Sequence, residues 1–164
     1  MIRNRASSCE RLEITGIVCD GKRSLFTAFG ALPVQMCHFH QTAIITRYIT
    51  QKSKFQAGKE MKILSYQLKH SSKSEFTTML KQWHEKWKDF LSEKTYTDDN
   101  KRWFYTHKRL QSAYRSLKTN LPYLFTYLDY PEIGMPNTTN SLEGTFSSLK
   151  TKIRMHSGTK EWRK

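Results

Sequence analysis

The sequence has few cysteines, few acidic residues and no long apolar run, and each shortage excludes a class of protein. Three cysteines in 164 residues are too few, and odd in number, for the disulfide framework of a small secreted protein, so we expect reduced thiols. No stretch approaches the roughly 18 uninterrupted apolar residues of a membrane-spanning helix. The basic N-terminus is not followed by the apolar region of a secretory signal. We therefore expect a cytoplasmic protein with no membrane partner.

The shortage of acidic residues leaves the chain strongly basic. Asp and Glu number 14 against 28 Lys and Arg, which gives a formal net charge of +14. Such an imbalance favours a polyanionic partner, and nucleic acid is the first candidate. Apolar residues make up 37% and aromatic residues 13% of the chain, enough to build a core. The length fits one globular domain or part of one.

The N-terminal third of the chain has the pattern of a strand–helix–strand unit. Residues 1–12 are polar, basic and without a clear period, so we expect an irregular segment there. The β-branched run at 13–19 predicts a buried strand that ends in the turn pair Asp20-Gly21. Residues 22–30 have helical spacing, and a second apolar run at 34–39 predicts a strand that feeds a helix starting near His40. A βαβ unit of this kind indicates an α/β fold.

The rest of the chain is predicted to be mostly helical. Residues 42–70 indicate two helices because the pattern breaks around 53–58. An apolar stripe follows over residues 76–91, and Ser72 with Glu75 forms a capping box at its start. After a polar turn at 95–100, helical spacing over 103–117 predicts an antiparallel partner helix. Prolines at 122, 131 and 136 predict a bend and a long loop over residues 121–136, and Asn137–Asn140 can cap a last amphipathic helix.

Three residues of this last helix could carry chemistry on nucleic acid. Glu143, Lys150 and Arg154 are spaced by seven and four, which places a carboxylate and two cations on one stripe. A carboxylate that holds a divalent metal beside cations that hold phosphate is what phosphoryl transfer on DNA requires. A structural alternative is that Glu in the first turn and cations late in a helix simply complement the helix dipole.

Asp20 is a second candidate because it follows a predicted buried strand directly. The carboxyl ends of strands in open sheets are where ligand and metal residues are presented. The alternative is that Asp20-Gly21 serves only as a turn, which geometry alone favours.

A third candidate is the Cys-x-x-His pair formed by Cys37 and His40. With Cys19 and His38 it could form a zinc site of mixed ligands, and the chain would then be a zinc-stabilised interaction module. The alternative is a packed cysteine and a hydrogen-bonded histidine, because a second pair with zinc-finger spacing is missing. Nothing resembles a phosphate-binding glycine loop or the surroundings of a Ser or Cys nucleophile.

Taken in order, three segments resemble the mutator-type insertion-sequence transposases of bacteria. They are residues 17–22, residues 34–40, and the Asn-Thr-Thr-Asn-Ser-Leu-Glu-Gly run at 137–144. In that family a strand ends in the second acidic residue of a DDE triad, a Cys-x-x-His motif follows, and a Thr-Thr-Asn-x-x-Glu element brings the last acidic residue. The resemblance spans residues 13–158 and implies a partial ribonuclease-H-like fold over 13–164, with a helical insertion at about 42–130.

The resemblance also implies roles for individual residues. Asp20 and Glu143 correspond to the second and third catalytic carboxylates, which would hold Mg²⁺ for DNA transposition, and Cys37 and His40 match the Cys-x-x-His pair. The residues that would line the DNA side of the last helix are Lys150, Lys152 and Arg154. The implied partner is the DNA at insertion-sequence ends, and the implied location is the bacterial cytoplasm, in association with the nucleoid.

The family's first catalytic Asp lies on an earlier strand, and residues 1–12 contain no Asp. We therefore expect a C-terminal remnant, or one reading frame of a split gene, that is active only when a complementary N-terminal transposase chain supplies that Asp. The alternative is a basic DNA-binding protein without catalytic activity, for which the charge and the helices suffice.

Overall fold

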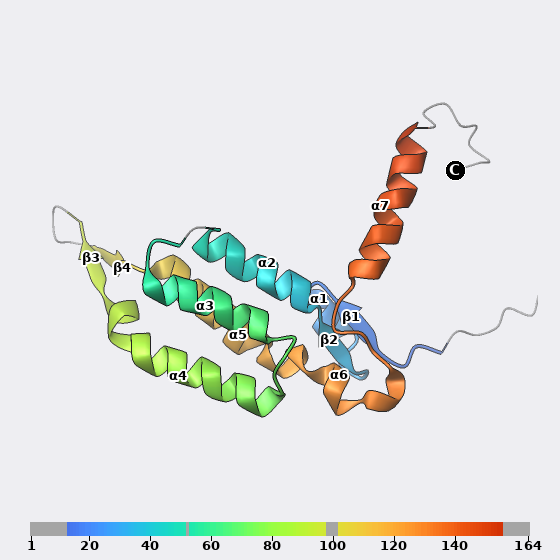
Figure 1. The fold of residues 1–164 in the computed structure, drawn as a ribbon, viewed down its shortest axis with the longest axis horizontal. Helices are drawn as coiled ribbons and strands as arrows, with labels where there is room; N and C mark the ends of the chain where they lie inside the picture. Colours follow the sequence, from blue (N-terminus) through green and yellow to red (C-terminus); the bar gives the residue numbers. More distant parts are fainter. Residues whose placement is uncertain (1–12, 52, 98–101, 156–164) are drawn as a thin grey trace, which may run out of the picture.

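The computed structural model describes residues 13–51, 53–97 and 102–155, and these form a mostly helical α/β structure (Figure 1). This agrees with the predicted class. The irregular segment predicted at residues 1–12 lies outside the described residues. In the part of the chain that the structure describes, no helix is long and apolar enough to cross a membrane.

The predicted βαβ unit is present and lies at one end of the molecule (Figure 1). Strand β1 (Ile17–Cys19) pairs in parallel with β2 (Val34–Met36), and the short helix α1 (Arg23–Ala28) connects them. The strand expected over residues 13–19 is wrong at its start. The pairing is limited to three residues on each strand, because β2 ends at Met36. The helix that follows β2 begins at His38, slightly earlier than the predicted start near His40.

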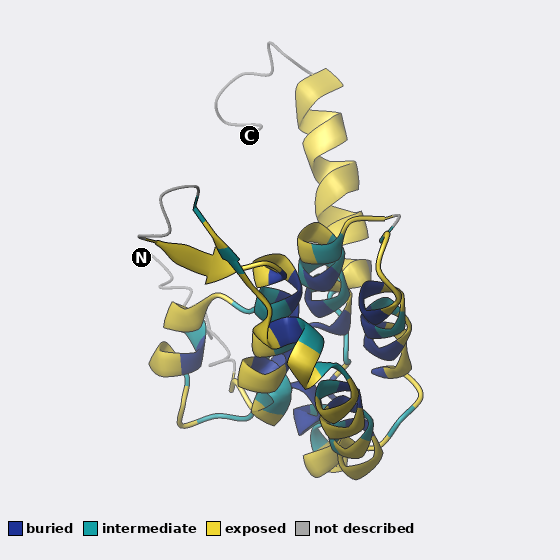
Figure 2. Cartoon of the chain, turned by 90° about the vertical axis from the view of Figure 1, so that its left-hand side faces the viewer, coloured by how far each residue is buried: buried dark blue, intermediate teal, exposed yellow. Residues whose placement is uncertain are grey.

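Four helices form the body beside this unit. They are α2 (His38–Ile49), α3 (Gln56–Gln67), α4 (Lys73–Ser92) and α5 (Lys108–Leu124). Helix α2 packs against α3 and α5, and α4 packs against α3 and α5, with their buried sides turned inward (Figure 2). The two helices expected between residues 42 and 70 are confirmed. So is the capping box of α4, in which Ser72 and Glu75 bond each other's backbone N–H.

A β-hairpin between α4 and α5 was not predicted. Strands β3 (Lys94–Tyr96) and β4 (Trp103–Tyr105) pair antiparallel, so the prediction that Trp103 and Phe104 lie on a helix is wrong. Three consecutive aromatic residues suit a strand better than a helix. The Lys94 ammonium group lies 4.1 Å from the Trp103 ring centroid, which adds a cross-strand contact. The antiparallel packing of α4 and α5 is as expected (Figure 1).

The bend predicted at residues 121–136 is shorter than expected. Helix α5 continues through Pro122 to Leu124, and the chain then forms α6 (Thr126–Asp129) and a 3-10 turn (Pro131–Ile133). Proline removes one helical hydrogen bond and crowds the preceding turn. Here it stands two residues before the helix end, and the buried side chains of Leu117 and Leu124 hold the last turns against the core.

The last helix, α7 (Asn140–Met155), projects from the body at the end that carries β1 and β2 (Figures 1 and 2). The helix itself is confirmed, and Glu143 lies in its first turn as predicted. The helix is amphipathic, and the side chains of its apolar stripe are about half exposed: Leu142, Phe146, Leu149 and Ile153.

Candidate functional site

Two of the sequence motifs, about one hundred residues apart, meet where β2 leads into α2. The Cys37 thiol donates to Thr138 Oγ1 at 3.7 Å and accepts hydrogen bonds from the backbone N and Oγ1 of Thr139, each at 3.4 Å. The backbone N–H of His38 donates to the Asn137 carbonyl at 2.9 Å. The Cys-x-x-His segment therefore holds the start of the Thr-Thr-Asn-x-x-Glu segment in place.

Within this junction, Glu143 faces His40. One carboxylate oxygen of Glu143 lies 3.5 Å from His40 Nε2 and accepts a hydrogen bond from Thr139 Oγ1 at 2.7 Å. Both side chains are partly open to solvent, with 31% of His40 and 44% of Glu143 exposed. The first turn of a helix is also a favourable place for a carboxylate. The carboxylate of Glu143 is thus oriented by two partners and remains accessible to a ligand.

The cysteine of the motif is buried and polarised. Burial raises the pKa of the Cys37 thiol, but hydrogen bonds from Thr139 and His40 stabilise the thiolate and together lower the pKa to about 7. At the neighbouring Cys19, burial outweighs a hydrogen bond from the Gly21 backbone and raises the pKa. The alternative given for this motif was a packed cysteine beside a hydrogen-bonded histidine. Its first half is met, because Cys37 has no exposed surface.

Asp20 lies at the carboxyl end of β1, as predicted. Its Oδ1 accepts a hydrogen bond from the Lys22 backbone N–H at 3.1 Å, as in the turn alternative. The turn also depends on Gly21, which has φ +95° and would place a Cβ 2.6 Å from the buried Met36. A backbone hydrogen bond of 2.8 Å from Cys37 N to the Cys19 carbonyl links this strand end to the junction. Asp20 and Cys37 therefore follow adjacent strands at one edge of the sheet.

The three predicted DNA-binding cations lie further along α7. Lys150, Lys152 and Arg154 are exposed in its second half. They are 7 to 11 residues beyond Glu143, which is about 10–16 Å along a helix. The structure thus places them on the same projecting helix as Glu143 but not in the junction itself.

No three His, Cys, Asp or Glu side chains gather into a metal-binding group among the described residues. Asp20 and Glu143 are carboxylates, the ligands that Mg²⁺ prefers, so their chemistry fits this metal although two are too few for a complete set. The four proposed zinc ligands do not gather either. His38 points into the core, where its Nε2 donates to the Leu124 carbonyl at 2.6 Å.

A buried polar network behind the junction was missed at the sequence level. Gln35 and His38 have no exposed surface, and both donate to the carbonyl of Leu124 at the end of α5. Gln35 Oε1 also accepts from the backbone N–H of Tyr127 at 3.0 Å. This network joins β2 to the corner between α5 and α6 and so fixes the segment from which Cys37 and His40 project.

His38 makes the stability of the protein depend on pH. Burial lowers the pKa of His38, the bond to Leu124 opposes this, and the nearby charge of Lys69 lowers it further. The other ring nitrogen, Nδ1, is buried without a partner, so a second proton has no acceptor. As pH falls below the ordinary value of 6.5, the unfolded chain takes up a proton that the folded chain does not.

We therefore expect the free energy of unfolding to fall below pH 6.5 by up to about 1.4 kcal/mol per pH unit. Urea unfolding between pH 5 and 8 measures this slope. His38→Gln should flatten it, and His70→Gln, at an exposed position, should leave it unchanged. A slope that persists in His38→Gln would contradict the assignment.

Comparison of the chain with known protein families, with curated proteins and with solved structures gives no match. The residues and their geometry are therefore the basis for a function, above all the junction between residues 37–40 and 137–143.

Proposed function

We propose that this chain is the C-terminal part of a DDE transposase that transfers DNA strands by metal-dependent phosphoryl transfer. The observation that carries the proposal is the junction itself. Cys37 and His40 of the Cys-x-x-His motif contact Thr139 and Glu143 of the Thr-Thr-Asn-x-x-Glu motif. Two motifs of the family that this chain resembles are thus in contact, although they lie about one hundred residues apart in the sequence.

The same proposal extends to the fold. The parallel pair of β1 and β2, joined through α1, is the piece of a ribonuclease-H-like sheet that these residues supply. The outer edges of this two-stranded sheet would accept further strands. The helical body from α2 to α6 would then be the insertion that separates the second and third catalytic carboxylates.

In this proposal, Asp20 and Glu143 provide two carboxylates for Mg²⁺, and a third would come from an Asp outside these 164 residues. His40 and Thr139 hold the Glu143 carboxylate in one orientation. Bound Mg²⁺ would supply Lewis acidity for activation of a water or 3′-hydroxyl and for stabilisation of the leaving oxygen. The cations of α7, Lys150, Lys152 and Arg154, would bind the DNA backbone. Such DNA binding would associate the protein with the bacterial nucleoid.

A strand-cleavage assay tests the proposal. The chain is combined with the polypeptide encoded directly upstream in any reading frame, and labelled oligonucleotides carry the ends of the element. We expect cleavage or joining that requires Mg²⁺ and stops with a chelator. Equal cleavage in the presence of chelator, or binding without any cleavage, would contradict a transposase.

The second candidate is a DNA-binding protein without catalysis, and the net charge of +14 favours it independently of the junction. Neutralised phosphates release counterions, so binding of this kind weakens steeply with salt. Both candidates predict salt-dependent binding. Mg²⁺-dependent cleavage distinguishes them.

A further inference from the structure

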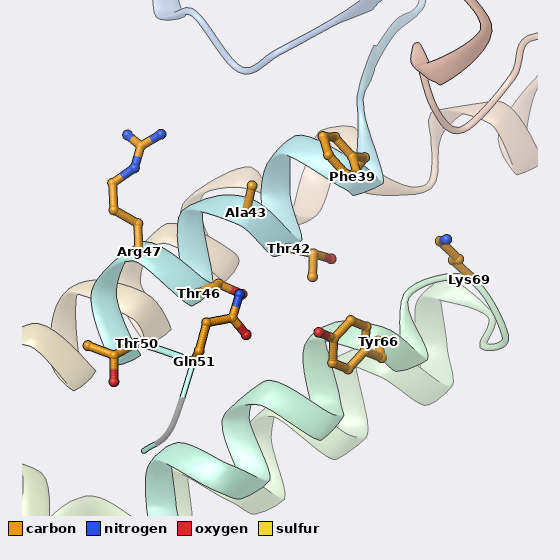
Figure 3. A pocket seen from close by; sticks show the side chains of 9 residues that line it. All are labelled: Phe39, Thr42, Ala43, Thr46, Arg47, Thr50, Gln51, Tyr66 and Lys69. Atoms are coloured by element: carbon orange, nitrogen blue, oxygen red, sulfur yellow. The ribbon is translucent and has the colours of Figure 1, made fainter. Parts of the chain in front are cut away.

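A groove of about 610 Å³ lies between α2 and α3, next to the candidate site (Figure 3). Phe39 from the start of α2 lies at one end, and across from it lie Tyr66 of α3 and Lys69, which follows α3. Arg47 and Thr50 lie toward the other end. Among the described residues that line this groove none is acidic, and the two charged ones are both cations.

Both aromatic rings of the groove are open to solvent. Phe39 is 48% and Tyr66 51% exposed, and they come from different helices. Exposed rings combined with cations are the features by which proteins bind single-stranded nucleic acid, with bases stacked on the rings and phosphates beside the cations. A duplex satisfies only half of this arrangement, because its bases are already stacked on one another.

The position of the groove connects it with the site. Phe39 lies between His38 and His40 in the sequence, and its ring packs edge-on against the His40 ring at 5.6 Å between centroids. His40 in turn contacts Glu143. A strand that lies in the groove would therefore lead directly to the Glu143 carboxylate.

We propose that the α2–α3 groove binds an unpaired segment of DNA, with bases on Phe39 and Tyr66 and phosphates at Arg47 and Lys69. This rests on the proposed function and adds the form of the substrate: the DNA is single-stranded where it approaches Glu143. The groove is separate from the cations of α7, which are Lys150, Lys152 and Arg154.

Fluorescence anisotropy with a labelled single-stranded DNA oligonucleotide tests the groove in the full chain. The double variant Phe39→Ala/Tyr66→Ala should bind it at least tenfold more weakly, because each stacked base contributes about fivefold or more and two are lost. Phe39→Leu/Tyr66→Leu keeps apolar volume without the rings and should show the same loss. Arg47→Gln/Lys69→Gln should make the slope of log binding constant against log salt concentration shallower, by about one for each residue replaced.

A matched control is available in the β3–β4 hairpin, where Tyr96 and Phe104 are 57% and 52% exposed. Tyr96→Ala/Phe104→Ala should bind the single strand as the unchanged protein does, and duplex binding should be insensitive to both pairs. Equal single-strand affinity in the Phe39/Tyr66 variants would overturn the proposal. So would an equal loss in the hairpin variant, or tighter binding of RNA of the same sequence.

The result is distinguishable from failure of the proposed function. Ring-dependent binding of single strands without Mg²⁺-dependent cleavage would support the groove and contradict the transposase. If cleavage requires Glu143 but the Phe39/Tyr66 variants bind single strands normally, the transposase would be supported and the groove contradicted.

Discussion

Glu143→Gln is expected to lower Mg²⁺-dependent DNA cleavage, measured in the presence of the complementary polypeptide, by about 100-fold or more. A bound metal ion contributes several kcal/mol to transition-state stabilisation, and each 1.36 kcal/mol is a factor of ten in rate. Gln has nearly the same shape as Glu and still accepts the hydrogen bond from Thr139, so the helix start should persist. What it loses is the negative charge that would hold Mg²⁺ in the proposed function.

The matched control is Glu132→Gln, which removes an exposed carboxylate from the turn at Pro131–Ile133. It should leave cleavage unchanged. DNA binding should be the same or slightly tighter in both variants, because each removes one negative charge. Cleavage that survives Glu143→Gln would exclude Glu143 as a catalytic residue even if the protein binds DNA.

The second large effect concerns stability. Gln35→Ala should lower the free energy of unfolding by about 3–5 kcal/mol, because each buried group left without a partner costs about 1–3 kcal/mol and a cavity adds to this. The Tyr127 N–H would lose its acceptor, and the Met36 carbonyl, to which Gln35 also donates at 2.7 Å, would lose a donor.

Chemical denaturation measures this change. Gln82→Ala, at an exposed position on α4, removes the same atoms and should change stability by no more than about 0.5 kcal/mol. A loss below about 1 kcal/mol in Gln35→Ala would mean that the buried network does not support the β2 segment.

Elements with local signals could be predicted from the sequence. The capping box at Ser72 and the apolar stripe behind it fix α4, because the stabilising contacts are only three or four residues apart. The turn at Asp20-Gly21 marks the end of β1 for the same reason. Trp103 and Phe104 were misassigned because their helical spacing to the residues that follow is accidental. Their pairing with β3 is not visible in the sequence pattern. Pro122 predicted a bend, yet packing of α5 outweighed its local cost.

The candidate site was predictable only in part. Sequence patterns selected Cys37, His40 and Glu143, but the contact of His40 with Glu143 depends on where α7 leaves the body. The buried Gln35 and His38 did carry a signal, since polar residues within an apolar run must find buried partners. Their partner, the Leu124 carbonyl, lies 86 to 89 positions away and has no sequence signature. The exposure of the Tyr66 ring likewise has no sequence signature, because it depends on how α3 packs.

The attachment of α7 also determines how easily this helix separates from the body. Each of the helices α2 to α5 packs against two of the others, whereas α7 is joined at its start through contacts such as the bond from Thr139 to Cys37. α7 is tied to the body at its N-terminal end, with its apolar stripe half exposed, so releasing it uncovers little further surface. The junction at Glu143 is therefore a unit that opens at low cost while the helical body stays folded.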